Sequence, residues 1–228
     1  KNTMDHLGRV TLSETYLDSN ENFVQDAGEP SVSKGETKYD ERGQAYESLT
    51  YKIVDGAATT TTLVTKYWYD VAGRLIKTAG PNGVFSKTEY DSLGRAVASY
   101  TCFDDAESTY ADADDVAGDT VIAQSVTTYD ADKGYAIASA TYQRNHDATG
   151  TGALTTSNAQ VTYSATWYDA LNRVTHSGFY GDNDGAAFTR PTTAPEPNSS
   201  DDVIVTKYEY DSVGRQYKTT DNKGVVSI

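Results

Sequence analysis

An arginine that could bind an anion recurs along this chain at a fixed distance from an aspartate. It lies four residues after the aspartate at Arg9, Arg74, Arg95, Arg173 and Arg215. A guanidinium can hold a phosphate or carboxylate through paired hydrogen bonds, so each arginine is a candidate anion site. The recurrence suggests that the chain is built of repeats, however, and catalytic groups rarely recur once in every repeat. We therefore expect each arginine to stack on a tyrosine of the neighbouring repeat or to pair with its aspartate.

Other residue types that perform catalysis are sparse. Three histidines, His6, His146 and His176, share no spacing, and Cys102 is the single cysteine. The sequence contains no Gly-x-Ser-x-Gly, no His-Glu-x-x-His and no phosphate-binding loop. A lone cysteine in a threonine-rich strand is most often a small apolar filler. The sequence therefore predicts that the chain is not an enzyme and carries no catalytic or cofactor-binding residues.

Acidic inserts and two tryptophans are the remaining candidates for ligand binding. Asp-rich stretches at 104–119 and 182–184 offer oxygen ligands for calcium, yet residues 182–185 match only a fragment of a calcium loop. Solvated acidic loops are the favoured interpretation, and calcium is the one cofactor left open. Trp68 and Trp167 each precede a tyrosine of the repeated motif. They could form a sugar-stacking platform, although a second packed sheet face explains them at least as well.

The turn that positions these residues is encoded by Tyr-Asp-x-x-Gly-Arg. In the copy at residues 69–74, Asp70 can bond the backbone of a type I turn through its carboxylate. Gly73 supplies the positive φ that the fourth position needs, which makes a three-residue hairpin loop with a bulge. Each copy therefore predicts a β-hairpin. Asn172 stands in the glycine position of another copy, and Asn tolerates the left-handed region better than other residues with a Cβ.

Seven copies of this motif run the length of the chain. Their aspartates lie 21 to 42 residues apart, a range typical of repeat proteins. The tyrosines are expected to form a packing ladder between successive hairpins. The predicted structural motif residues are Asp5, Gly8, Arg9, Tyr39, Asp40, Gly43, Tyr69, Asp70, Gly73, Arg74, Tyr90, Asp91, Gly94, Arg95, Tyr129, Asp130, Tyr168, Asp169, Asn172, Arg173, Tyr210, Asp211, Gly214 and Arg215.

These residues resemble the signature of the Rhs/YD-repeat family, which includes teneurins, bacterial Rhs proteins and the shell component of insecticidal toxin complexes. The resemblance covers residues 4–228 and implies tandem hairpins in a curved, spiralling sheet that can enclose a toxin or a peptide. Three repeats depart from the signature: Met4 replaces tyrosine, Gln44 replaces arginine, and residues 133–135 break the turn register. The family's contacts are not carried over to those repeats. Its autoproteolytic core has no match here.

Composition is consistent with strands and excludes some partners. Val, Leu, Ile and Phe make up only 38 of 228 residues and the net charge is −14, a combination typical of disorder. The 18 tyrosines and abundant threonines are strand formers, however, and they lie at fixed offsets from the turns. The acidic charge disfavours nucleic acid and anionic membranes, and no apolar run is long enough for a membrane span.

We expect one all-β module over residues 1–228, a fragment of a longer secreted or cell-surface protein. Its main predicted function is structural, as part of a β-sheet shell or scaffold whose partners are flanking repeats or further copies. The alternative is a surface adhesin that binds glycans or a protein partner through the long inserts and an exposed tryptophan. The sequence alone does not separate these two functions.

Overall fold

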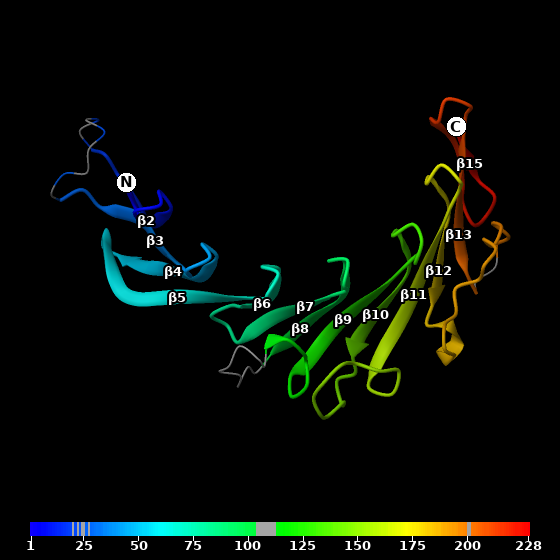
Figure 1. The fold of residues 1–228 in the computed structure, drawn as a ribbon, viewed down its shortest axis with the longest axis horizontal. Helices are drawn as coiled ribbons and strands as arrows, with labels where there is room; N and C mark the ends of the chain where they lie inside the picture. The colour runs from blue at the N-terminus through cyan, green and yellow to red at the C-terminus, as the bar shows by residue number, and fades with distance from the viewer. Residues whose placement is uncertain (20, 22, 24–25, 27, 104–112, 200–201) are drawn as a thin grey trace. The chain divides into compact units, whose positions relative to one another are not determined.

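The computed structural model describes residues 1–19, 21, 23, 26, 28–103, 113–199 and 202–228. These residues form fifteen β-strands in one sheet, and each strand pairs with the next strand of the chain. The pairings from β1 to β7 and from β9 to β15 are antiparallel. The expected fold class, an all-β chain of tandem antiparallel hairpins, is confirmed (Figure 1).

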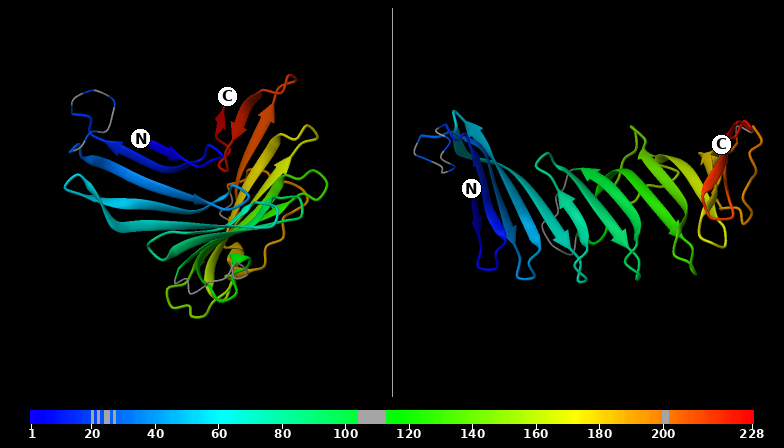
Figure 2. Two further views of the ribbon diagram at one scale, coloured as in Figure 1. Left: turned by 60° about the vertical axis from the view of Figure 1, so that its left-hand side comes forward. Right: turned by 90° about the horizontal axis from the view of Figure 1, so that it is seen from above.

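Two compact units divide the chain, the first built from residues 1–87 and 102–115 and the second from residues 88–101 and 116–228. Within each unit the sheet is twisted, as Figure 2 shows. The strands are β1 (Asn2–Met4), β2 (Val10–Tyr16), β3 (Ser31–Tyr39), β4 (Ala45–Val54), β5 (Ala57–Tyr69), β6 (Leu75–Ala79), β7 (Val84–Tyr90), β8 (Ala96–Phe103), β9 (Thr120–Tyr129), β10 (Ala136–Arg144), β11 (Ala159–Tyr168), β12 (Val174–Gly181), β13 (Ile204–Tyr210), β14 (Gln216–Thr220) and β15 (Val226–Ser227). Whether the chain folds as one module stays a prediction.

The motif turns join the strands as the sequence predicts. At residues 69–74 the N–H of Gly73 donates to the carbonyl of Asp70 at 3.0 Å, and Gly73 has a φ of 85°. The pairing of β5 with β6 shifts register between Trp68 and Tyr69, which is the predicted bulge. Asn172 has a φ of 70° and takes the place of glycine in its turn. The spacing of aspartate and glycine therefore determines where successive strands reverse.

The inserts bury one face of the sheet in the second unit. Along β11 the side chains alternate, with Val161, Tyr163, Ala165 and Trp167 buried and the residues between them more exposed. Leu154, from the insert that precedes β11, is 3% exposed, and its N–H donates to Gln124 Oε1 at 2.7 Å. This insert is therefore part of the core rather than a loop in solvent.

In the described part of the insert after β8, Asp114 and Asp115 are exposed as expected, and the expectation of a solvated acidic loop is wrong only at Asp119. Val116 and Asp119 are buried, and the carbonyl of Asp119 accepts a hydrogen bond from the N–H of Gly152 at 2.8 Å. The acidic residues of 104–112 lie outside the described part of the chain.

In the first unit, the buried Phe85 is contacted by two buried lysines, with Lys77 Nζ 4.4 Å and Lys87 Nζ 5.6 Å from its ring centroid. Apolar and aromatic contacts from the inserts compensate for the low aliphatic content.

Candidate functional site

Each motif aspartate organises its own turn. In the sixth repeat, Asp169 Oδ1 accepts hydrogen bonds from the N–H groups of Leu171 at 2.8 Å and Arg173 at 3.0 Å. Its Oδ2 accepts from Nε of Arg173 at 2.7 Å. The same pairing of arginine Nε with aspartate Oδ2 occurs in the turns of Asp5, Asp70, Asp91 and Asp211. One side of each guanidinium is thus held by the carboxylate four residues before it.

The next repeat contributes a tyrosine to the same arginine. The guanidinium carbon of Arg173 lies 4.5 Å from the ring centroid of Tyr210, and Arg9 and Arg95 lie at 4.6 and 4.4 Å from the rings of Tyr39 and Tyr129. We call this arrangement of aspartate, arginine and following tyrosine the clasp. At these three arginines both expected contacts are present, because the guanidinium pairs with its aspartate and stacks on the neighbouring tyrosine.

The tyrosine hydroxyl adds a second contact to the clasp. Tyr210 Oη donates at 2.9 Å to the carbonyl of Val174, the residue that follows Arg173. The corresponding carbonyl accepts a hydroxyl at four other junctions, from Tyr39, Tyr69, Tyr129 and Tyr168. The composition shows only that buried tyrosines need partners; the structure shows that the partner is a backbone carbonyl of the preceding hairpin.

The hydroxyl is placed where neighbouring hairpins separate. Between β12 and β13 the last ladder pair on the turn side is His176 with Lys207, which lie three residues after Arg173 and three before Tyr210. The same offset occurs between β2 and β3, β4 and β5, and β10 and β11. Beyond this pair the strands diverge, and the tyrosine bridges the gap. The clasp therefore fixes how each hairpin is set against the previous one.

Two repeats that depart from the signature replace the arginine by different means. Gln44 Nε2 donates to the carbonyl of Gly73 in the next turn at 3.0 Å. In the fifth repeat the turn is one residue longer, because the N–H of Asp130 donates to the carbonyl of Tyr135. The ring of Tyr135 then packs 4.7 Å from the ring centroid of Tyr168, so an aromatic pair substitutes for the stack of arginine on tyrosine.

In the second repeat, the turn glycine also leaves room for the arginine of the preceding repeat, which the sequence does not reveal. A Cβ on Gly43 would lie 3.2 Å from Nη1 of Arg9, because the arginine of one repeat extends over the glycine of the next. Cβ atoms on Gly134 and Gly214 would lie 3.4 and 3.7 Å from the preceding repeat's arginine. Asn172 follows the repeat in which Tyr135 stands in place of arginine. Asn172, which has a Cβ, thus stands in a turn whose preceding repeat lacks the arginine of the signature.

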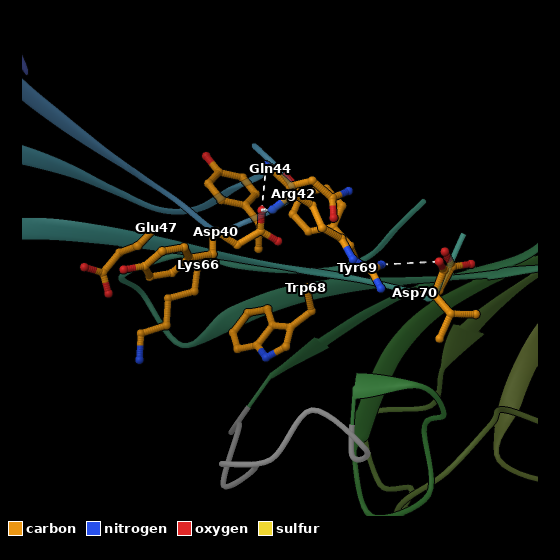
Figure 3. A pocket seen from close by; sticks show the side chains of 11 residues that line it. Asp40, Arg42, Gln44, Glu47, Lys66, Trp68, Tyr69 and Asp70 are labelled. Carbon is orange, nitrogen blue, oxygen red and sulfur yellow. Dashed lines mark hydrogen bonds between the residues drawn. The ribbon is translucent and has the colours of Figure 1, made fainter. Parts of the chain in front are cut away.

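A slot of about 630 Å³ opens where Gln44 replaces arginine. It lies between the second and third turns in the first unit, and its lining includes Tyr69 and Asp40. Figure 3 shows Trp68 and Lys66 on the opposite side of β5 from Gln44. On the side of Gln44, the ring of Tyr69 together with the amide of Gln44 and the carboxylate of Asp40 could contact a small polar ligand.

The two tryptophans have different surroundings. Trp167 is 4% exposed, and Arg190 lies over its ring at 4.9 Å while Nε1 donates to the carbonyl of Pro191 at 3.0 Å. A sugar-stacking role for Trp167 is therefore wrong. Trp68 is half-buried and lines the slot, with Lys77 Nζ 4.9 Å from its ring centroid. The alternative of a packed second face is correct for Trp167.

The insert after β12 covers this face as a strap, residues 186–198. Phe188 stacks on Tyr163 with ring centroids 5.0 Å apart, and Glu196 pairs with Lys207 at 2.7 Å. His176 lies 3.7 Å from Glu196. Burial lowers the pKa of His176, because desolvation disfavours the imidazolium, and the nearby Glu196 opposes that shift only in part. The histidine therefore has a packing role under the strap.

Metal binding has little support among the residues whose positions are described. None of their His, Cys, Asp and Glu side chains form a group of three or more that could hold a metal ion. In the run 182–185, Asp182 Oδ1 instead accepts a hydrogen bond from the N–H of Asp184. Calcium binding at 104–119 stays a prediction, since most of that insert lies outside the described residues. The part of the chain that the structure covers contains no helix long and apolar enough to cross a membrane.

The hydrogen bonds within the turns lower the pKa of the five motif aspartates that are followed by an arginine of the signature. The pKa of Asp169 lies below its ordinary value, first because the N–H of Arg173 donates to the carboxylate and then because its guanidinium does. Backbone and guanidinium donors also lower the pKa of Asp91 and Asp211. At Asp5 and Asp70 desolvation is the largest influence and raises the pKa, but the combined donors of the arginine outweigh it.

Stability is therefore expected to fall in acid. Because these pKa values are lower in the folded chain than the value of about 3.9 for an unfolded aspartate, their contribution is present above about pH 4 and is lost as the pH falls below it. Urea unfolding at pH 6, 4 and 3 measures this loss. Asp169→Asn should be less stable at pH 6 and show a shallower loss in acid, and a slope equal to that of the unchanged chain would contradict the assignment.

Removing one clasp hydroxyl has a separate expected effect. Tyr210→Phe keeps the ring over Arg173 but removes the bond to the carbonyl of Val174, which is expected to lower the free energy of unfolding by about 0.5–1.5 kcal/mol. Tyr217→Phe is the matched control, since Tyr217 lies on β14 with 48% of its surface exposed. Denaturant unfolding of both variants compares them, and equal effects would show that the hydroxyl bond does not stabilise the junction.

Comparison with known proteins was made by sequence and by structure. The sequence matches no known protein-family model and no curated protein. The fold matches a structure of the Photorhabdus luminescens Tc holotoxin pore with a TM-score of 0.53 and 16% identity, over 96% of this chain and 11% of that one. A crystal structure of TcdB2–TccC3 matches over 96% of this chain and 11% of that one, at a TM-score of 0.35 and 11% identity.

The chain thus spans 11% of the length of the holotoxin chain that it matches. At this identity the similarity concerns the fold, and it agrees with the seven motif turns and the consecutive strand order. The resemblance drawn from the Tyr-Asp-x-x-Gly-Arg signature is confirmed at that level: this chain has the fold of an Rhs/YD-repeat-like segment.

Proposed function

We propose that this chain is a non-enzymatic structural module, a stretch of hairpin wall in a larger secreted or cell-surface protein. The observation that supports this most is the clasp, in which the recurring polar residues bind one another between hairpins. Arg173 pairs with Asp169 and stacks on Tyr210, so both of these contacts are made within the chain. The similarity in fold to a segment of a Tc holotoxin chain gives independent support.

In this function the tyrosines and arginines act as assembly contacts. Each hairpin buries its ring against the previous hairpin, so the stability of the whole should be approximately the sum of repeat and junction terms. The wall would form part of a β-sheet shell or scaffold, and its partners would be further repeats of the same kind. The long inserts then thicken the wall, as Leu154 and Phe188 do in the second unit.

The test compares chains of different repeat number. One chain carries an extra copy of residues 70–90 inserted after Tyr90, which adds one complete repeat with its own turn and keeps the strand register. A matched chain carries the same insertion with the copied arginine and tyrosine replaced by alanine. A wall module predicts that the first chain is more stable to denaturant than the original and that the matched chain is not. Equal stability of all three chains would contradict the structural function.

A glycan-binding adhesin is the second candidate, and the slot beside Trp68 is the observation in its favour. Trp167 gives it no support, because the strap covers its ring. Binding on a glycan array that is lost in Trp68→Ala but retained in Tyr217→Ala would establish this function. The absence of any saturable glycan binding would leave the structural function alone.

A further inference from the structure

The second repeat has an aspartate whose usual guanidinium is missing. In the turns that carry the arginine of the signature, its Nε donates to Oδ2 of the aspartate four residues before it. Gln44 takes the arginine position in the second turn, and its Nε2 donates instead to the carbonyl of Gly73. Asp40 still accepts the N–H groups of Arg42 and Gln44 through Oδ1. Among the residues that the structure describes, none donates a hydrogen bond to Asp40 Oδ2.

The tyrosine ring of the same junction also lacks its cation. Tyr69 occupies the tyrosine position, since its hydroxyl donates to the carbonyl of Ala45 at 2.8 Å. At three other junctions a guanidinium lies 4.6, 4.4 and 4.5 Å from the ring, but no cation in the described part of the chain lies over the ring of Tyr69. Burial raises the pKa of Tyr69 most, followed by the charges of Tyr67 and Asp40. The carboxylate of Asp40 is therefore close enough to the ring to act on it.

The slot contains the space that such a guanidinium would take. Its volume is about 630 Å³, and Asp40, Gln44 and Tyr69 all line it. Asp40 and Gln44 lie together on one side of β5 (Figure 3). Arg42 also lines the slot, but its Nη1 donates to the carbonyl of Val71 at 3.3 Å, which holds this guanidinium at the next turn. A carboxylate oxygen and an aromatic ring are thus both available to a molecule that enters the slot.

The fifth repeat also lacks the arginine, but there the chain fills the position itself. The ring of Tyr135 packs 4.7 Å from the ring centroid of Tyr168 and covers it. Gln44 has no planar cation to offer, and its amide is bound to the carbonyl of Gly73. The second repeat therefore keeps the carboxylate and the ring of the clasp and leaves the place between them to another molecule.

From this geometry we infer that the slot between Asp40 and Tyr69 binds the side chain of an arginine from another polypeptide. The guanidinium donates to Asp40 Oδ2 and stacks on the ring of Tyr69, as the chain's own arginines do at three junctions. The net charge of −14 attracts a basic partner in addition. Lysine fits the slot less well, because its ammonium is a compact charge without a planar face to stack. This site is additional to the proposed structural function and does not depend on it.

The experiment titrates the ¹⁵N-labelled chain with N-acetyl-arginine methylamide and follows its chemical shifts by NMR. We expect saturable shifts centred on residues 40–44 and on Tyr69. The citrulline derivative has the same shape without the charge, and the lysine derivative has the charge without the planar group. Each should bind at least about tenfold more weakly than the arginine derivative, as expected for the loss of a hydrogen bond between charged groups.

Two substitutions locate the site. Gln44→Arg supplies a guanidinium from the chain itself, so the arginine derivative should no longer bind. Asp40→Asn keeps an oxygen for the turn N–H groups but removes the charge, and it should weaken binding about tenfold. The matched control is Asp221→Asn, because Asp221 Oδ1 also accepts two backbone N–H groups of its own turn and the net charge changes equally. This control should leave the affinity unchanged.

Three results would overturn the inference. They are the absence of saturable binding, an equal affinity for the arginine and lysine derivatives, and undiminished binding to Gln44→Arg. The second would mean that an acidic chain attracts any cation, and so would equal weakening by Asp40→Asn and Asp221→Asn. The NMR spectrum of each variant also shows whether it is folded, and Gln44→Arg restores the residue of the signature. None of these results bears on the proposed structural function, which is tested through the stability of chains with an added repeat.

Discussion

Leu154→Ala is expected to lower the free energy of unfolding by about 2–4 kcal/mol, the range for removing a buried leucine side chain. Leu154 is 3% exposed although it belongs to the insert before β11. Its N–H donates to Gln124 on β9, which ties the insert to the sheet of the second unit. Its loss leaves a cavity between the insert and the sheet. Denaturant unfolding monitored by far-UV circular dichroism measures the effect.

The matched control is Leu171→Ala, since Leu171 lies in a motif turn with 72% of its surface exposed. This change should alter stability by no more than about 0.5 kcal/mol, as is usual for exposed positions. The comparison separates the insert from the turns. If the two leucines had equal effects, the insert that contains Leu154 would be a loop on the surface and not part of the core.

The hairpins were predictable because their signals are local. Asp70 and Gly73 act within four residues, and the conformation each requires is a property of its own side chain and backbone. The recurrence of the pattern added the order of the strands, since short turns make successive strands neighbours. The clasp was predictable in part, because Arg173 and Tyr210 are recognisable as partners while the carbonyl that accepts the hydroxyl is not.

The inserts were not predictable because their contacts depend on positions far apart in the sequence. Phe188 meets Tyr163 and Tyr180 only after two strands and a long loop have been placed. The acidic run at 182–184 indicated a solvated loop, but it contains no information about the apolar face that the following residues cover. The same reason explains Trp167, whose alternation along β11 predicted a face but not the strap over it.

The departures from the signature show how the clasp tolerates change. Tyr135 keeps a flat group over Tyr168, and Gln44 keeps a donor to the following turn. Neither Tyr135 nor Gln44 matches the arginine of the sequence motif, because the motif specifies residue types and not the contacts that they make. Gln44 lines the slot in the first unit, so a position where the motif is substituted is also one where a ligand could enter.

Gly43→Val is expected to lower the free energy of unfolding more than Gly8→Val, although both residues occupy the same turn position. Both have a positive φ, 86° and 77°, and forcing a β-branched residue into that region costs about 1–3 kcal/mol. A Cβ on Gly8 meets nothing within 4 Å, whereas one on Gly43 lies 3.2 Å from Nη1 of Arg9. We therefore expect the side chain at position 43 to push the Arg9 guanidinium away and weaken its stack on Tyr39, which adds about 0.5–1 kcal/mol.

The control for this comparison is Asn172→Gly, which should leave stability unchanged or slightly raise it. Asn172 already has a φ of 70°, and glycine adopts that conformation without steric strain. In a second control, Arg9→Ala removes the guanidinium, so Gly43→Val made in that background should have no larger effect than Gly8→Val. Unfolding curves of the single and double variants give the coupling between positions 9 and 43. A coupling of zero would mean that the turn glycine acts through its own backbone alone, and the conformation of each hairpin would then be independent of the one before it.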